Sequence, residues 1–267
     1  MHAAWNAMMK ASGDRFLTLT TVIGVGAVIC VPVAFIVAAP AAASWPYLAA
    51  SFVVHQAYFA LLIQAYRFGD LSQVYPLARG LGPLLVTGLA IIVAGEWPGT
   101  FAAVGIVLVS GGIASLSFAG RVKRDQDSRA VFYAAATGVV IALYTLADGL
   151  GVRSSGSSLG YIAWLFSTTP IPMLLGAVIF RRGDLRPFLK KEWRPSVGGG
   201  MLALASYGLG IYALGQGAMG HVAALRETSV LFGALIGALR FKEPFGPKRI
   251  AAAAAIMAGL VLLQIGE

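Results

Sequence analysis

An arginine and a glutamate stand side by side in an apolar stretch that is long enough to cross a lipid bilayer. Arg226 and Glu227 occupy the first turns of residues 221–243, HVAALRETSVLFGALIGALRFKE. A charge in hydrocarbon costs a few kcal/mol or more, so it usually faces a partner, a polar cavity or the interface. Glu227 is therefore a candidate for proton coupling. The alternative is a fixed ion pair with Arg226 or with Arg79, which would lock two parts of the chain together.

Arg79 lies in a second stretch of this kind, residues 75–96, YPLARGLGPLLVTGLAIIVAGE. Tyr75 and Arg79 are four residues apart and share one helical face. One interpretation is a cavity-lining face on which Arg79 meets an anionic group such as a carboxylate. The other places Arg79 roughly 10 Å into the span, from where its long side chain reaches the interface or a structural ion pair.

Polar side chains also recur in other apolar stretches. Aromatic and amide groups suit a pocket for a zwitterionic solute, although Trp and Tyr near helix ends also serve as interfacial anchors. A histidine can titrate near neutral pH or can simply be hydrogen-bonded. The further pocket candidates are Trp5, Asn6, His55, Tyr58, Tyr144 and Gln216. Asp148, four residues after Tyr144, is the second candidate for proton coupling.

Glu96 and Glu243 end their stretches just before Trp-Pro-Gly and Pro-Phe-Gly. A carboxylate before a helix that starts with proline complements the dipole of that helix, so we interpret both residues as structural caps. The chain has no phosphate-binding loop, no metal-ligand spacing and no nucleophile elbow, and Cys30 is its one cysteine. We therefore expect no enzyme, no cofactor and no metal site.

The elements that must position these residues are membrane-spanning helices. Hydrophobic residues make up 58% of the chain and charged residues 12%, against roughly 25% charged in soluble domains, and the mean hydropathy is +0.79. Apolar runs of about 20 residues recur, each enough to span the hydrocarbon. The sequence predicts an incomplete first helix in residues 1–10 and full spans at about 16–39, 47–66, 72–94, 98–118, 130–148, 159–180, 195–216, 221–239 and 247–265.

One ungapped offset of 147 residues relates the two halves (226 − 79 for the arginines). It aligns Arg79 with Arg226, Glu96 with Glu243 and Gly112 with Gly259. The sequence thus predicts a first five-helix repeat at 1–118, a linker at 119–129 and a second repeat at 130–267, together one membrane domain. Because five is an odd number, the second copy inserts upside down, as in many secondary transporters.

The basic residues predict the orientation. The net charge is +9, and 17 of the 20 Lys and Arg residues fall in the loops after odd-numbered spans. The positive-inside rule places these loops in the cytoplasm and both termini outside the plasma (inner) membrane. Short basic loops of this kind are not a nucleic-acid-binding surface.

Three motifs carry a family resemblance: HAAWNAMMKASGDR at 2–15, GDLSQVYPLARGLGPLLVTGLAIIVAGE at 69–96 and LRETSVLFGALIGALRFKE at 225–243. With them the chain resembles the EamA-like branch of the drug/metabolite transporter superfamily. The resemblance implies ten helices in two inverted five-helix repeats, and carriage of small metabolites, often amino acids, commonly outward. Family members have a complete first helix, so we expect the first helix to be truncated here.

These observations predict an all-α secondary transporter of amino acids or organic anions that works by alternating access, with a site between spans 3, 4, 8 and 9. Its partners would be the lipid bilayer and a small solute, with protons and a second copy of the chain as further candidates. Two alternatives stay open. One is an efflux carrier for lipophilic or cationic compounds, which would hardly need the arginines, and the other is a membrane scaffold that transports nothing.

Overall fold

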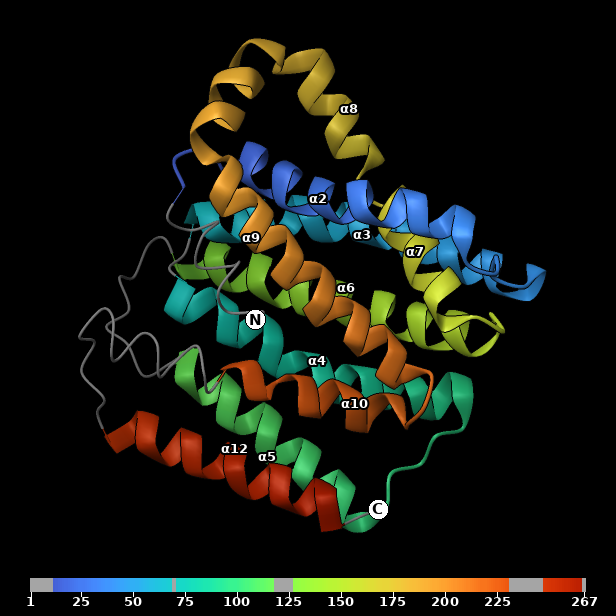
Figure 1. Cartoon of the computed structure of the whole chain (residues 1–267). Coiled ribbons are helices and arrows are strands. Elements are labelled where there is room, and N and C mark those ends of the chain that lie inside the picture. Colours follow the sequence, from blue (N-terminus) through green and yellow to red (C-terminus); the bar gives the residue numbers. More distant parts are fainter. Residues whose placement is uncertain (1–11, 69–70, 118–126, 231–246, 266–267) are drawn as a thin grey trace. The chain divides into compact units, whose positions relative to one another are not determined.

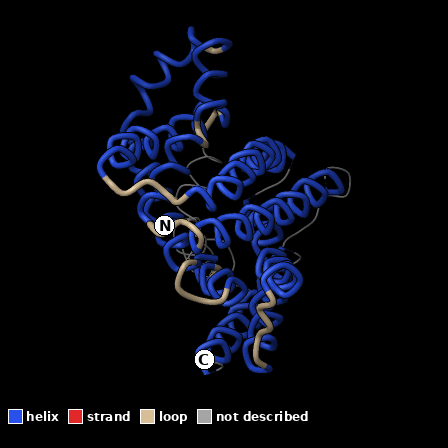
Figure 2. The backbone as a smooth tube through the Cα atoms, turned by 90° about the vertical axis from the view of Figure 1, so that its right-hand side faces the viewer, coloured by secondary structure: helices blue, strands red, loops and turns tan. Residues whose placement is uncertain are grey.

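The computed structural model describes residues 12–68, 71–117, 127–230 and 247–265, and every regular element in these ranges is a helix (Figure 2). Trp5, Asn6 and Glu243 lie outside the described residues. Six helical segments in these ranges are long and apolar enough to cross a membrane: Arg15–Ile36, Ala42–Phe68, Val74–Ala94, Ser128–Arg153, Ser158–Phe180 and Arg182–Leu214. Two shorter apolar helices lie at Thr100–Leu116 and Ile250–Ile265. Each of these segments overlaps one predicted span.

The chain divides into two compact units, and each takes segments from both halves of the sequence. The first unit comprises residues 1–59 and 147–216, and the second comprises residues 60–146 and 217–267. Two helices, α3 (Trp45–Phe68) and α6 (Asp127–Arg153), contribute to both units.

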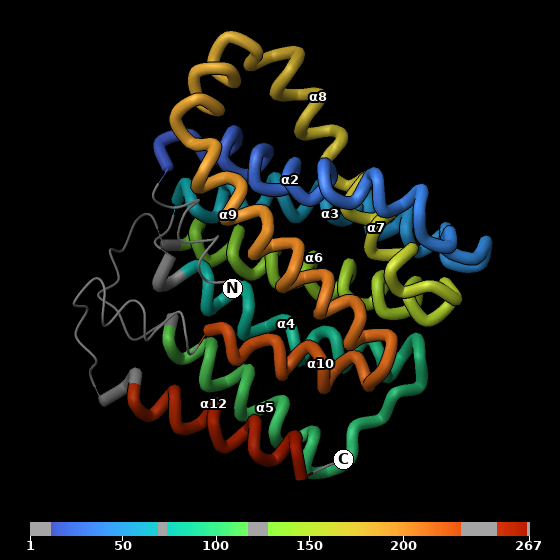
Figure 3. The backbone as a smooth tube through the Cα atoms, viewed as in Figure 1, coloured from blue at the N-terminus to red at the C-terminus, as the bar shows by residue number. Residues whose placement is uncertain are grey.

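In the first unit, α2 (Arg15–Ile36) packs against α7 (Ser158–Thr168) and against α9 (Arg182–Leu214), as Figure 3 shows. Small residues allow the close approach of α2 and α9, because a Cβ added to Gly200 would lie 2.6 Å from the carbonyl oxygen of Val22. The hydroxyls of Thr21 and Ser196 join the same two helices at 2.9 Å. Close packing of small residues and hydroxyl contacts are typical of helix pairs in membranes.

Two helices of the first unit differ from the predicted spans. The span predicted at 159–180 is broken into α7 and α8 (Ile171–Phe180), because Pro170 and Pro172 cannot donate backbone hydrogen bonds to the preceding turn. The start predicted at Pro195 is wrong, since α9 already begins at Arg182 and continues through Pro187 and Pro195. The positive charge of residues 182–194 favours a loop, yet the Leu, Lys, Arg and Glu residues of this segment are good helix formers.

In the second unit, α5 (Thr100–Ser117) lies beside α12 (Pro247–Ile265) and α4 (Leu71–Ala94) (Figure 1). The helix α10 (Met219–Arg226) packs on α4. A Cβ added to Gly138 of α6 would lie 2.9 Å from the carbonyl oxygen of Ala78, so α6 also approaches α4 closely. The second unit therefore contains the helices that carry Arg79 and Arg226.

The crossing of α5 and α12 depends on glycines. A Cβ added to Gly112 would lie 3.0 Å from the carbonyl oxygen of Ala252, and one added to Gly105 would lie 2.7 Å from that of Gly259. The later residue of α5 thus meets the earlier residue of α12, so the two helices run antiparallel where they touch.

Candidate functional site

A buried ion pair in the second unit joins α4 to the end of α10. The Nε atom of Arg79 donates to Oε2 of Glu227 at 2.8 Å, and the two side chains are only 7% and 6% exposed. Glu227 also interacts electrostatically with Arg226, the last residue of α10. Two arginines and one carboxylate, from segments that are far apart in the sequence, therefore form one charged group among the described residues.

Tyr75 completes this group. Its ring lies 5.9 Å from the guanidinium carbon of Arg79, within reach of a cation–π interaction, and its hydroxyl lies 3.4 Å from that of Ser229. Glu227 is the C-cap of α10, so the helix stops at the acid that holds Arg79. The C-terminal end of a helix carries partial negative charge, so the guanidinium of Arg79 is favourably placed beside this end of α10.

Glu96 contacts the other end of α10. One of its carboxylate oxygens accepts a hydrogen bond of 2.7 Å from the backbone N–H of Met219, the first residue of α10, whose N-cap Ala218 offers no side-chain acceptor. We expected Glu96 to complement the helix that follows it in sequence. The contact with Met219 lies at a helix more than a hundred residues away in the sequence, which charge and proline spacing alone do not identify.

A second polar cluster lies in the first unit around Asp148, whose side chain is fully buried. Its carboxylate accepts a hydrogen bond from the hydroxyl of Tyr161 at 3.0 Å and a further one from that of Tyr207. The ring of His55 lies 5.6 Å from the ring of Tyr207, edge to face. The Nδ1 atom of His55 lies 2.9 Å from the carbonyl oxygen of Ser51.

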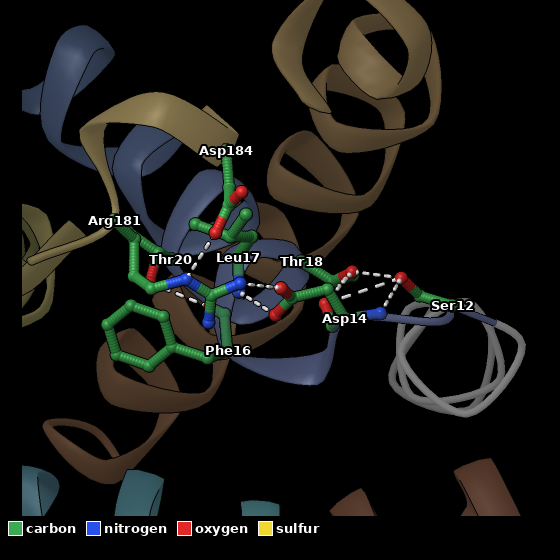
Figure 4. Close-up of polar contacts among 8 residues, drawn as sticks. All are labelled: Ser12, Asp14, Phe16, Leu17, Thr18, Thr20, Arg181 and Asp184. Atoms are coloured by element: carbon green, nitrogen blue, oxygen red, sulfur yellow. Dashed lines mark hydrogen bonds and ion pairs between the residues drawn. The ribbon is translucent and has the colours of Figure 1, made fainter. Parts of the chain in front are cut away.

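A corner between helices holds a third set of charges, shown in Figure 4. Arg181, between α8 and α9, contacts Asp14 at 2.6 Å and Asp184 at 2.7 Å. Asp14 is also the N-cap of α2 and accepts from the backbone N–H of Leu17 at 3.0 Å. The hydrogen bonds to Asp184 and Asp14 raise the pKa of the Arg181 guanidinium above its usual value, so this partly exposed corner stays charged.

Comparison with known proteins identifies the family of the chain. The model of the EamA-like transporter family matches residues 128–265, slightly more than half of the chain. The chain belongs to the EamA-like transporter family. Membership implies a multi-pass protein of the lipid bilayer that transports a solute, and it suggests that the transporter is not an enzyme.

Solved structures resemble this EamA-like transporter over nearly its whole length. One of them, described only as a crystal structure of a protein, aligns with a TM-score of 0.73 and 17% identity, covering 97% of this chain and 90% of the other. At that identity the likeness concerns the fold alone. No curated protein matches the sequence.

The predicted site residues of this EamA-like transporter fall into different places. Tyr75, Arg79, Arg226 and Glu227 come together, and His55 lies in the Asp148 cluster. Tyr58 is half-buried beside His55, with ring centroids 6.3 Å apart, and Tyr144 is buried on α6. Gln216 is exposed in the turn after α9, which does not favour a pocket role.

Two partners of Asp148 were not found by sequence reasoning. Tyr161 and Tyr207 are 13 and 59 residues from Asp148. The available signal is that a carboxylate inside a span requires donors, but nothing in the spacing indicates which of the chain's 9 tyrosines supply them.

Proposed function

We propose that this EamA-like protein is a secondary transporter that exports small metabolites such as amino acids or organic anions across the plasma (inner) membrane. The observation that carries the substrate class is the buried Arg79–Glu227 pair with Tyr75 packed on it. An arginine in the membrane interior is costly and serves function more often than stability. Its planar guanidinium matches the geometry of a carboxylate.

In this proposal Glu227 holds the place that a substrate carboxylate takes. Arg79 is neutralised by Glu227 when no solute is bound, which lowers the cost of keeping an arginine in the membrane. An arriving carboxylate exchanges with Glu227, and Tyr75 offers a flat apolar surface beside it. Because Glu227 caps the end of α10, releasing it from Arg79 would allow that helix end to move.

We further propose that the protein works by alternating access between two inverted five-helix repeats, 1–118 and 130–267. The glycine contacts of α5 and α12 support this. Gly112 approaches Ala252 and Ile256, while Gly259 approaches Gly105 and Val109. Each residue of the first set has its counterpart in the second set at the offset of 147 residues, so one contact repeats with the copies exchanged.

Two equivalent helices that cross antiparallel are what copies of opposite orientation produce. The segment that matches the family model, residues 128–265, also nearly coincides with the second proposed repeat. The basic corner at Arg181 and the start of α9 would then face the cytoplasm, with the C-terminus outside. Labelling of single cysteines placed at Lys190 in a Cys30→Ser background, from either side of the membrane, checks this orientation.

Uptake into proteoliposomes tests the proposal. The protein would be reconstituted with a panel of radiolabelled amino acids and organic anions, alongside Arg79→Met and a control, Arg181→Met, in the partly exposed corner. We expect saturable flux of at least one anionic or zwitterionic compound that is lost in Arg79→Met and kept in Arg181→Met. Flux of lipophilic cations that ignores Arg79→Met would contradict the substrate class. No flux of any compound would favour a scaffold.

A further inference from the structure

We propose that Asp148 and His55 form a proton-binding site, and that this site, not Glu227, links transport to a pH gradient. The coupling role rests on the proposed transport function, whereas proton binding does not. The site is built from three helices besides α6. Ser51 and His55 come from α3, Tyr161 from α7 and Tyr207 from α9, all within the first unit.

The hydrogen bonds around Asp148 can hold the ionised carboxylate. Tyr161 and Tyr207 donate to different carboxylate oxygens, and the Ser51 hydroxyl donates to the same group. Three donors of this kind stabilise the charged form of a carboxylate. The tyrosine contact also needs room, which Gly151 supplies, because a Cβ there would lie 2.5 Å from the hydroxyl of Tyr161.

His55 is placed to share the proton. Its Nδ1 atom faces the carbonyl oxygen of Ser51 at 2.9 Å, and a carbonyl can only accept, so Nδ1 carries a hydrogen in the neutral ring. The other ring nitrogen, Nε2, is then the basic one. His55 interacts electrostatically with Asp148, so one proton added to the pair is held either by an oxygen of Asp148 or by Nε2 of His55.

The burial of Asp148 decides which ligand fits. The residue is 0% exposed and its neighbours Tyr161 and Ser51 are also 0% exposed. The carboxylate is occupied by hydroxyl donors from three helices, so a proton is the ligand that binds without rearranging them. A metal ion or an organic cation would have to displace these donors.

The two buried acids differ in their counter-charges. Glu227 is paired with Arg79, and an arginine stays charged throughout the physiological pH range. Within the described part of the chain, no lysine or arginine forms an ion pair with Asp148, and its basic neighbour is a histidine. Arg153, five residues further along α6, donates to the carbonyl oxygen of Leu214. Histidine titrates near neutral pH. In this pH range the charge of the Asp148–His55 pair therefore changes, whereas the charge of the Arg79–Glu227 pair does not.

Infrared difference spectroscopy tests proton binding without any solute. The full chain in nanodiscs would be titrated from acid to alkaline pH while the C=O stretch of protonated carboxyl groups is followed. We expect a band that disappears with rising pH, that is absent in Asp148→Asn and that persists in Glu227→Gln. If the parent and Asp148→Asn gave the same spectra at every pH, the site would be refuted.

Tyr207→Phe provides a second test of the site in case Asp148→Asn does not fold. It leaves the carboxyl group in place and removes one donor to its ionised form, so the band should persist to higher pH than in the parent. An unchanged titration would count against the assignment. His55→Gln should also shift the titration, whereas Tyr212→Phe, an exposed tyrosine on the same helix as Tyr207, should not.

Flux measurements then test coupling. Proteoliposomes with the radiolabelled panel would be assayed in solute counterflow and under an imposed pH gradient. We expect the gradient to accelerate flux in the parent, and Asp148→Asn to keep counterflow while losing that acceleration. Acceleration that survives in Asp148→Asn would overturn the coupling role. Absence of every flux in the parent would overturn the transport function alone, because the infrared titration is independent of it.

Discussion

The buried ion pair yields a prediction that separates its contribution to stability from its contribution to transport. The change is a double-mutant cycle of Arg79→Met, Glu227→Leu and the two together. At 2.8 Å and an effective dielectric constant of about 20, the attraction between the charges is about 6 kcal/mol. Desolvation offsets much of this, and removing one partner of a buried pair typically costs about 3–5 kcal/mol.

The two single variants should differ in severity. In Arg79→Met the isolated carboxyl group of Glu227 can take up a proton, and at pH 7 this limits the cost to about 4 kcal/mol, at about 1.4 kcal/mol for each unit above a reference pKa near 4.3. In Glu227→Leu the isolated guanidinium of Arg79 cannot release its proton, so the loss should be greater. The double variant buries no charge at this position and should recover most of the stability.

The assay is reversible unfolding in mixed detergent micelles, followed by tryptophan fluorescence, with solute flux measured on the same preparations. We expect the double variant to fold like the parent and to lose the flux of the anionic solute. If it transported the anionic solute at the parent's rate, Arg79 would be a structural partner only and the proposed carboxylate recognition would be wrong. If both single variants were as stable as the parent, the ion pair itself would be refuted.

Two further predictions concern packing and capping. Gly112→Ala and Gly259→Ala should each lower stability by about 1–3 kcal/mol through overpacking. The two losses should be similar, because the surroundings of the two glycines are equivalent. In the control Gly111→Ala the added Cβ has no neighbour within 4 Å, so this variant should be neutral or stabilising in thermal unfolding. Glu96→Ala should cost about 1 kcal/mol by removing the acceptor for the Met219 N–H. Glu96→Gln, which keeps an acceptor oxygen, should unfold closer to the parent, and equal melting of both variants would contradict the capping role.

Much of the helical fold could be predicted because length and hydropathy determine it directly. A run of about 20 apolar residues in a bilayer must satisfy its backbone internally, so it becomes a helix. The bounds of α2, α3 and α4 lie within a few residues of the predicted spans, and those of α12 coincide with the span predicted at 247–265. Charge misled the prediction at Arg182–Arg194, where the basic residues that orient a protein in the membrane also extend its helix.

The partners of the polar residues could be predicted less well, because they depend on which helices meet. Spacing places Tyr75 and Arg79 on one face of a helix, and the ring lies within 6 Å of the guanidinium. Spacing cannot say that Tyr161 and Tyr207 reach Asp148, nor that Glu96 caps α10. Such contacts follow from tertiary packing, for which a single sequence gives only the requirement that a buried polar group finds a partner.

The proposed internal repeat would explain why the charged group lies where the two copies differ. Under the offset of 147 residues, Arg79 corresponds to Arg226, whereas Glu227 corresponds to Gly80. Equivalent residues near a two-fold axis approach one another, so a perfect repeat would bring two arginines together in the membrane, where like charges repel strongly. Glu227, present in one copy only, interacts with both arginines. A glycine at the matching position lets α4 approach α5, since a Cβ on Gly80 would lie 2.9 Å from the backbone nitrogen of Ala114. The second copy thus supplies the counter-charge and the first copy supplies the close packing, so exchanging Gly80 and Glu227 should abolish both.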